Sequence, residues 1–321
     1  MAIPGWTRSE SPFHAGELAI QARFGAQERM DKVGRRVIRE FLPEQHQQFF
    51  TQLPYVIVGT VDVFGNLWAS ILVGEPGFIS SPDDRTLQVA AQPLFGDPLA
   101  TTLADGIDIG MLGIELHTRR RNRMNGTITA IHANGFEVKV GQSFGNCPQY
   151  IQARMYQLKE FDLTTPKPIH EITALSAPER MAIASADTFF IATAYQDTAA
   201  GSARGVDVSH RGGKAGFVRI DDDHTLTVPD FSGNCHFNTF GNLELNPRAG
   251  LLFVDFEQGN LLYLTGTAEV IWEGAEVSTY AGAERLLRFH LEHGYRVEGS
   301  LPLRWSTPEF SPFLDNTGSW E

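Results

Sequence analysis

The chain has 321 residues, a fifth of them charged and 42% of them apolar, and its net charge is −12. This length is enough for two domains, and the acidic balance argues against a nucleic-acid surface because phosphate backbones select basic proteins. Two cysteines, Cys147 and Cys235, are too few for a disulfide framework, and no cleavable signal or long apolar span is evident. We therefore expect a cytoplasmic protein that binds neither nucleic acid nor a membrane.

The first half of the chain predicts helices followed by short strands. Residues 1–12 read as a loose arm, because Pro4, Gly5 and Pro12 discourage regular structure. Apolar residues at three- and four-residue spacing then predict two helices, the second ended by Pro43. Alternating patterns predict strands over 53–63, 67–73, 77–81, 86–90, 107–116 and 123–140, and a glycine-rich turn that opens a short helix follows over 141–156.

The second half repeats this order. A linker over 164–168 leads to a helix over 177–186 and a strand over 187–195. The stretch 203–247 predicts three strands joined by polar loops and then a short helix. A hairpin over 249–272 and a helix over 274–290 come next, and the residues after 290 are expected to be irregular.

The two halves are related by an internal repeat. Residues 70–89 and 209–228 align without a gap at a shift of 139 (209 − 70), and nine positions are identical: Ser70/Ser209, Gly74/Gly213, Gly77/Gly216, Phe78/Phe217, Asp83/Asp222, Asp84/Asp223, Thr86/Thr225, Leu87/Leu226 and Val89/Val228. At a shift of 140, Gly110, Leu112, Gly126, Thr127 and Ile131 then meet Gly250, Leu252, Gly266, Thr267 and Ile271. Two copies of one unit, each a small closed or partly closed barrel, therefore make up most of the chain.

Anion-binding side chains distinguish the second copy from the first. Arg211 and Lys214 meet Leu72 and Glu75, and the polar residues after the third strand meet apolar or small ones. Hydroxyls, cations and a helix start are what a phosphate monoester requires. The candidate ligands are Ser209, Arg211, Lys214, Asn234, His236, Asn238 and Thr239. The first copy carries arginines at 119–121 and at Arg123, which either complete this site from across a barrel interface or form a solvated strand end.

Residues 229–270, together with GVDVSHRGGKAGFVRI before them, resemble the pyridoxamine 5′-phosphate oxidase-like FMN-binding split barrels. Residues 11–25 and 142–152 resemble a tandem subfamily in which two such barrels are fused. The resemblance implies a mainly β fold with flanking helices (α+β), in which two tandem split β-barrels pack as a pseudo-dimer. It also implies FMN at the barrel interface, with its phosphate on Ser209 and Arg211, assisted by Asn238 and Thr239. Arg123 would reach the phosphate or the flavin from the other barrel.

The chain departs from this family in two ways. The family's usual basic pair near Cys235 and His236 is not present as such, which puts tight binding in doubt. The first copy lacks the anion-binding side chains, so we expect one FMN rather than two. The expected domains are an arm with helices (1–48), a first barrel with a degenerate anion site (49–163), a linker with a helix (164–186), and a second barrel with the phosphate site and a C-terminal helix (187–321).

The function that follows is an FMN-dependent oxidoreductase acting on an unknown small substrate, with NAD(P)H or oxygen as the electron partner. We expect a monomeric pseudo-dimer or a homodimer, and the sequence assigns no catalytic acid or base. A haem-binding module, with His290 or His293 as the axial ligand, a non-catalytic flavin binder and an assembly domain without cofactor are the alternatives. Asp221–Asp223 reads as turn chemistry rather than a metal site, because Asp83 and Asp84 recur in the same turn of the first copy.

Overall fold

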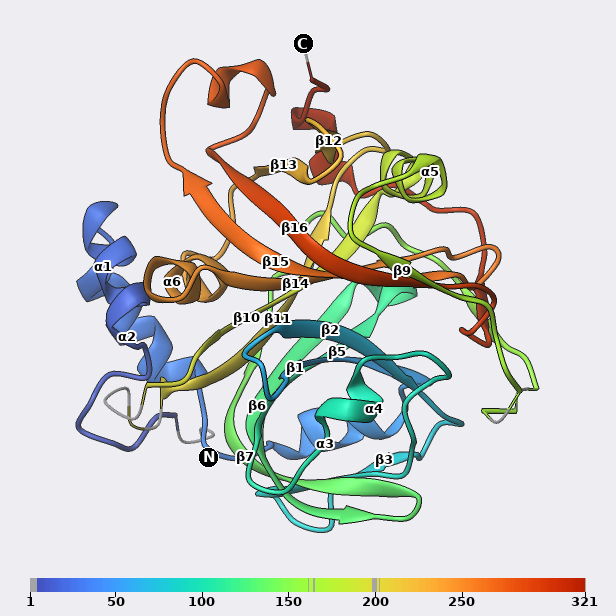
Figure 1. Ribbon diagram of the computed structural model, residues 1–321. Coiled ribbons are helices and arrows are strands. Elements are labelled where there is room, and N and C mark those ends of the chain that lie inside the picture. The colour runs from blue at the N-terminus through green and yellow to red at the C-terminus, as the bar shows by residue number, and fades with distance from the viewer. Residues whose placement is uncertain (1–4, 161, 164, 198–200, 202, 321) are drawn as a thin grey trace.

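The computed structural model describes residues 5–160, 162–163, 165–197, 201 and 203–320, and it is built mostly of antiparallel strands with few helices (Figure 1). Residues 1–4 of the expected arm and Thr164 of the expected linker lie outside the described residues. The first half of the chain forms the lower part of the view in Figure 1, and the second half forms the upper part.

The first half forms one seven-stranded sheet with the order β2-β1-β5-β6-β7-β4-β3. Three helices precede it: α1 (Ala15–Arg23), α2 (Gln27–Val37) and α3 (Glu44–Thr51). Its strands are β1 (Tyr55–Val61), β2 (Leu67–Val73), β3 (Ile79–Ser80), β4 (Thr86–Val89), β5 (Asp108–Glu115), β6 (Arg120–His132) and β7 (Gly135–Gly145), with the short helix α4 (Leu99–Thr102) between β4 and β5.

The second half repeats this topology, with the order β11-β10-β14-β15-β16-β13-β12. Helix α5 (Ala177–Ser185) precedes the sheet and α6 (Asn238–Leu245) takes the place of α4. Its strands are β10 (Thr188–Tyr195), β11 (Gly205–Gly212), β12 (Arg219–Ile220), β13 (Thr225–Asp230), β14 (Arg248–Val254), β15 (Leu261–Ile271) and β16 (Arg285–Val297). Strand β9 (Ile169–Ile172) pairs with β16, and β8 (Tyr156–Leu158) pairs with β17 (Leu303–Trp305). The predicted fold, two tandem split barrels packed as a pseudo-dimer, is confirmed.

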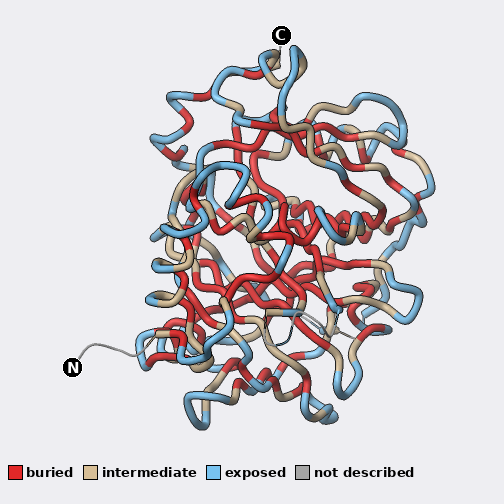
Figure 2. Tube along the Cα trace, turned by 90° about the vertical axis from the view of Figure 1, so that its left-hand side faces the viewer, coloured by how far each residue is buried: buried red, intermediate tan, exposed pale blue. Residues whose placement is uncertain are grey.

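Three of the apolar clusters among the described residues follow from this arrangement. One lies inside the first barrel around Phe136, and one lies inside the second barrel around Phe289. The third joins the barrels, because Ile57 and Leu112 of the first share a cluster with Val208 of the second. Figure 2 shows buried segments running through the middle of the molecule. An apolar cluster therefore joins the two barrels.

Two glycines of the repeat let the barrels approach closely. A Cβ added to Gly110 of β5 would lie 2.4 Å from the Val206 carbonyl oxygen on β11. A Cβ added to the matching Gly250 of β14 would lie 2.3 Å from the Leu67 carbonyl oxygen on β2. Each barrel thus presses a glycine against the edge strand of the other, which explains why the repeat keeps glycine at both places.

Two sequence expectations about helices are wrong, and one helix was not predicted. The region 274–290 is not a helix, since residues 285–297 form β16, where Leu287, Phe289 and Leu291 alternate inward to the second core. The described C-terminal part of the second barrel therefore lacks the expected C-terminal helix and has only 3-10 turns. No helix opens within 141–156, because β7 continues to Gly145 and Phe144 is buried. Helix α3 was not predicted.

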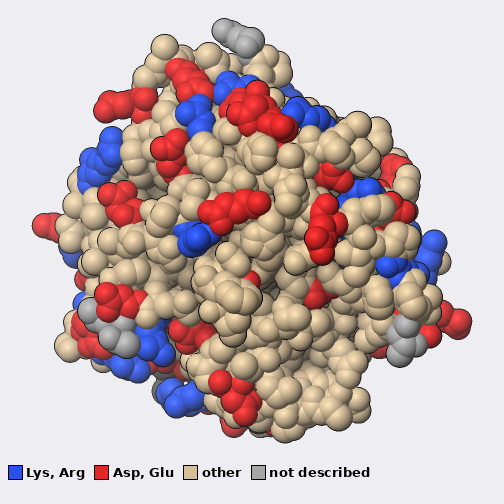
Figure 3. All heavy atoms as spheres, in the orientation of Figure 1, with Lys and Arg blue, Asp and Glu red and all other residues tan. Residues whose placement is uncertain are grey.

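Among the helices of the described chain, none combines the length and the apolar character needed to cross a membrane. Figure 3 shows one face of the molecule, on which acidic and basic side chains are interspersed.

Candidate functional site

A pocket of about 180 Å³ opens at the boundary between the barrels. We call it the seam pocket. The first barrel and the segment after it contribute Leu112, Arg121, Arg123, Asn146, Cys147, Gln149 and Tyr150. The second barrel contributes Ser209–Gly212, Phe217, Pro229–Cys235, Phe237–Phe240, Glu284 and Arg285. The lining therefore combines four arginines with two carboxylic acids, several hydroxyl and amide groups, and aromatic rings.

Arg123 connects the two barrels at this pocket. It lies on β6, and its Nη1 donates to Asp207 Oδ1 at 2.9 Å while its Nη2 donates to the Ser209 hydroxyl on β11. Its Nε is buried and has no hydrogen-bond partner among the described residues. Burial lowers the pKa of Arg123, and the neighbouring Asp207 carboxylate opposes that shift. The guanidinium thus lies buried between Asp207 and Ser209, and its Nε is left without a partner among the described residues.

Arg211 lies on the second-barrel side of the pocket. Its Nη1 is paired with Asp230 Oδ1, and its guanidinium lies 4.9 Å from the centroid of the Phe240 ring. Arg285 approaches the other oxygen of Asp230 at 3.6 Å, so one carboxylate serves two arginines. Nε of Arg211 is buried without a partner among the described residues. Burial raises the pKa of Asp230 although both arginines favour its charged form.

Arg121 adds a further, partly buried cation. Its Nε donates to the Cys147 carbonyl oxygen at 2.7 Å, and burial, reinforced by Arg123 and Arg211, lowers its pKa to about 10. The neighbouring His210 is kept neutral, because burial and then Arg121 and Arg211 lower its pKa well below the ordinary value. Mutual repulsion among guanidiniums in a partly dehydrated site is relieved by an anion, so the electrostatics favour an anionic ligand.

Polar groups at the start of α6 complete the site. Thr239 Oγ1 and Ser209 Oγ are 3.1 Å apart, and Arg123 donates to the same serine. Asn238, the first residue of α6, donates from its side chain to Glu17 of α1. Phe237 before it has a left-handed φ of 61°, which turns the chain into the helix. Hydroxyl groups, guanidiniums and a helix start thus converge on one space, as expected for binding a phosphate group.

The structure brings together most of the residues that the sequence nominated. Ser209, Arg211, Asn234, Asn238, Thr239 and Arg123 all line the seam pocket. Lys214 is not part of the lining, and its Nζ donates to the Thr317 carbonyl oxygen instead. His236 lies behind the lining, buried against the rings of Phe13 and Phe144.

Comparisons with known proteins give fold neighbours of low similarity. No protein-family model and no curated protein matches the chain. Among solved structures, HupZ of Group A Streptococcus is 20% identical over 37% of this chain and 90% of its own, with a TM-score of 0.29. A "putative pyridoxamine 5′-phosphate oxidase" from Lactobacillus delbrueckii is 12% identical over 38% and 94%, with a TM-score of 0.30. An FAD-binding protein from Mesorhizobium loti is 15% identical over 40% and 97%, with a TM-score of 0.26.

Sequence reasoning missed some of the pocket lining. Arg121 was one of a cluster without an individual role, and Arg285 lay in a stretch expected to be helical. Tyr150, whose ring packs 5.0 Å from that of Phe231, was placed in an expected helix that does not form. A period-two reading of 285–297 would have predicted a strand that begins at Arg285, and the structure places this residue opposite Asp230 in the β13–β16 register.

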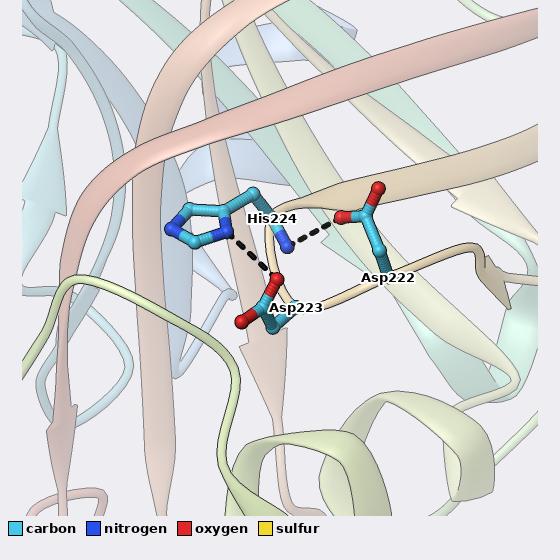
Figure 4. A group of neighbouring side chains, drawn as sticks. All are labelled: Asp222, Asp223 and His224. Carbon is cyan, nitrogen blue, oxygen red and sulfur yellow. Dashed lines mark hydrogen bonds and ion pairs between the residues drawn. The ribbon is translucent and has the colours of Figure 1, made fainter.

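The acidic segment of the second barrel forms a hydrogen-bonded turn. Figure 4 shows Asp222, Asp223 and His224 together at the surface. Asp222 Oδ1 accepts from the main-chain N–H groups of His224 and Thr225, at 2.7 and 2.8 Å. Asp83 Oδ1 accepts from the Arg85 N–H in the matching turn of the first barrel. Both carboxylates therefore close the same turn.

The histidines named as haem ligands lie on β16 rather than on a helix. His290 forms an exposed pair with Glu269 at 3.6 Å, and the ring of His293 packs against Trp68 and Tyr295. Neither histidine lines the seam pocket. Cys147 and Cys235 do line it, from opposite barrels, and both are free thiols.

Proposed function

We propose that the seam pocket binds the phosphate of FMN and that the protein is a flavin-dependent oxidoreductase acting on a small organic molecule. The observation that carries this proposal is the reach of Arg123 from the first barrel to Ser209 in the second, beside Arg121 and Arg211. Four arginines against the acids Asp230 and Glu284 leave the pocket with an excess of positive charge. A phosphate monoester supplies the missing negative charge and acceptor oxygens.

The donor set fits a phosphate. The Nε atoms of Arg123 and Arg211 and the Nδ2 of Asn146 are buried donors without a partner among the described residues. Unpaired buried donors cost free energy, which an acceptor oxygen would recover. The enclosed volume of about 180 Å³ is below the roughly 300–1,000 Å³ of pockets that bury a whole ligand. We therefore assign to it the phosphate-bearing end of the cofactor.

The residues of this chain would act on the cofactor by binding and orientation. Arg121, Arg123, Arg211 and Ser209 would hold the phosphate, and the apolar interface between the barrels would limit water. Bound flavin would supply two-electron transfer between a small substrate and NAD(P)H or oxygen. His290 and His293 lie outside the pocket, so neither could be the axial ligand of a haem bound there.

The test is an absorption spectrum of the purified protein, followed by titration of the protein with FMN and with inorganic phosphate as competitor. Flavin absorbance, or saturable quenching of FMN fluorescence that phosphate reverses, is the expected result. A protein that neither carries nor takes up FMN contradicts the cofactor assignment. FMN binding that phosphate leaves unchanged contradicts the phosphate assignment alone.

A further inference from the structure

A buried carboxylate occupies the first barrel at the place that matches the seam pocket. Asp97 lies just before α4, and its Oδ1 accepts from the Ser70 hydroxyl at 2.6 Å and from the Leu99 main-chain N–H at 2.8 Å. Its Oδ2 accepts from the Tyr263 hydroxyl at 3.1 Å. All three side chains are buried. Three donors from two barrels therefore enclose one carboxylate.

Strand register shows that these donors correspond to groups of the seam pocket. Ser70 lies opposite Val58 in the β1–β2 pair, as Ser209 lies opposite Ile191 in the β10–β11 pair. Val58 and Ile191 in turn hold matching places in the two sheets.

The second donor also has a counterpart. Arg123 lies opposite Leu112 in the β5–β6 pair, and Tyr263 lies opposite Leu252 in the β14–β15 pair. Arg123 of the first barrel reaches Ser209 of the second, while Tyr263 of the second reaches the carboxylate that Ser70 of the first holds. The two clusters are related by the pseudo-symmetry of the molecule.

The clusters differ in where the acceptor comes from. In the first barrel it is the chain's own Asp97, and Leu99, whose N–H it binds, is the first residue of α4. In the second barrel, α6 begins at Asn238, and the residues before it, His236 and Phe237, carry no carboxylate. The carboxylate that accepts from Arg123 there belongs to Asp207 on β11 and not to the segment before α6. Among the described residues, no side chain accepts from the main-chain N–H of Asn238. The donor that corresponds to the Leu99 N–H therefore has no side-chain acceptor.

We propose that the first barrel retains an anion-binding niche equivalent to the one in the second, and that the Asp97 carboxylate occupies it as an internal ligand. The niche consists of Ser70 Oγ, Tyr263 Oη and the Leu99 N–H, and its ligand class is a small carboxylate. The first barrel thus keeps the donors of the site, and a side chain of the same protein occupies it. This goes beyond the FMN proposal, since it concerns the other barrel and stands whether or not flavin binds.

The charge state of Asp97 agrees with an anion niche. Burial raises the pKa of Asp97 to about 6, and the bonds from Ser70, Leu99 and Tyr263 oppose that shift. The three donors therefore favour the carboxylate form of Asp97 against the cost of burying it. A hydroxyl of Tyr263 in place of the guanidinium of Arg123 matches the single charge of a carboxylate rather than the double charge of a phosphate.

Asp97→Ala removes the carboxylate and leaves its three donors unpaired around a small cavity. We expect this variant to melt below the parent, and formate to raise its Tm by a saturable amount of about 2 °C. Sodium chloride at equal ionic strength is the salt control. Asp97→Asn is the volume-matched control, because its amide fills the cavity and leaves no room for formate. The parent and Asp97→Asn should show no saturable response.

A double variant distinguishes uptake in the niche from a general salt effect. Asp97→Ala combined with Tyr263→Phe lacks one donor, so its response to formate should be at least several-fold weaker than that of Asp97→Ala. If Asp97→Ala does not fold alone, the yield of folded protein on refolding with formate, compared with chloride, is the readout. Equal responses to formate and chloride, or an undiminished response in the double variant, would overturn the proposal. No flavin enters this experiment, so its failure is distinct from failure of the FMN assignment.

Discussion

Arg211 is the pocket arginine whose removal should affect ligand binding most cleanly. It lies at the pocket surface, and its partner Asp230 keeps Arg285 when Arg211 is removed. We expect Arg211→Ala to keep the fold and to weaken FMN binding by roughly 10- to 100-fold, because a hydrogen bond to a charged group contributes about 1.5–3 kcal/mol. Fluorescence titration with FMN, beside a thermal melt, measures both effects.

Arg219→Ala is the matched control for Arg211→Ala. Arg219 lies on β12, pairs with Asp221 and Glu276, and does not line the seam pocket. This variant should bind FMN as the parent does. Equal affinity in Arg211→Ala and the parent would show that the phosphate lies elsewhere.

Substitution of Arg123 should affect stability, unlike that of Arg211, because Arg123 is buried and bridges the barrels. Among the described residues, removing it leaves the buried Asp207 carboxylate with the amides of Asn125 and Asn242 as its partners. Loss of one member of a buried ion pair costs about 3–5 kcal/mol. We expect Arg123→Ala to lower the free energy of unfolding by that amount, measured by chemical denaturation. A loss below 1 kcal/mol, the range of a solvent-exposed pair, would contradict the bridging role.

Glu17 should make stability depend on pH. Burial, and then the Asp207 carboxylate, raise its pKa to about 8 from an ordinary 4.5, while His14 N–H and Asn238 oppose the shift. The unfolded chain ionises Glu17 first, so its contribution destabilises the folded state increasingly from pH 4.5 to about 8. Buried His14, His46 and His236 have lowered pKa values and destabilise the folded state only as pH falls below about 6.5.

The window from pH 6.5 to 8 therefore isolates Glu17. The parent should lose up to about 1.4 kcal/mol of unfolding free energy per pH unit there. Glu17→Gln, which cannot ionise, should show a flatter profile in the same denaturation series. A parent profile that is flat or rises across this window would contradict the raised pKa.

Individual site residues were predictable where the repeat offered a comparison. Ser209 stood out because the first copy has a serine at the same position. Arg211 stood out because the first copy has a leucine there. Partners set by tertiary structure were not predictable, and Lys214 shows why: its ammonium binds the Thr317 carbonyl, a residue far along the chain. The internal anion Asp97 was equally hidden, because an aspartate before a short helix reads as a cap.

At the scale of elements, α1 and α6 pack closely because a glycine of α6 has no side chain. A Cβ on Gly241 would lie 2.5 Å from Glu17 Cγ and 2.7 Å from its main-chain nitrogen. Gly→Ala inside a helix usually stabilises it by up to about 1 kcal/mol. Here we expect Gly241→Ala to destabilise the protein by about 1–3 kcal/mol through overpacking, with faster hydrogen exchange in α1.

Gly145→Ala is the control for the packing of α1 on α6. Its added Cβ would meet only Asn122 Oδ1, at 3.5 Å, an ordinary contact. Thermal melts of the two variants should therefore differ in magnitude. A Gly241→Ala protein as stable as Gly145→Ala would mean that the two helices can separate without cost.

The positions of the central strands could be predicted from the sequence more reliably than element type near the C-terminus. The hairpin of β14 and β15 is found where alternation and a glycine-containing turn predicted it. The stretch RLLRFHLEH satisfied a helical spacing as well, and pairing of β16 with both β13 and β15 decided in favour of a strand. Such pairing partners are distant in sequence, which a local pattern does not contain.

On the scale of the whole molecule, two barrels of the same strand order carry different groups at equivalent places. The barrels share strand order and the glycines at their interface, yet the first holds its own Asp97 carboxylate while the second lines its pocket with four arginines. Two identical barrels would offer two equivalent anion sites. This chain should offer one.

Calorimetric titration of the full chain with FMN, and in parallel with riboflavin, tests this account most directly, because the two ligands differ by the phosphate alone. We predict one FMN bound per chain and an affinity for riboflavin at least 10-fold weaker, as expected if the phosphate contributes more than about 1.4 kcal/mol. Equal affinity for the two ligands, two FMN sites per chain, or no binding of FMN would contradict it.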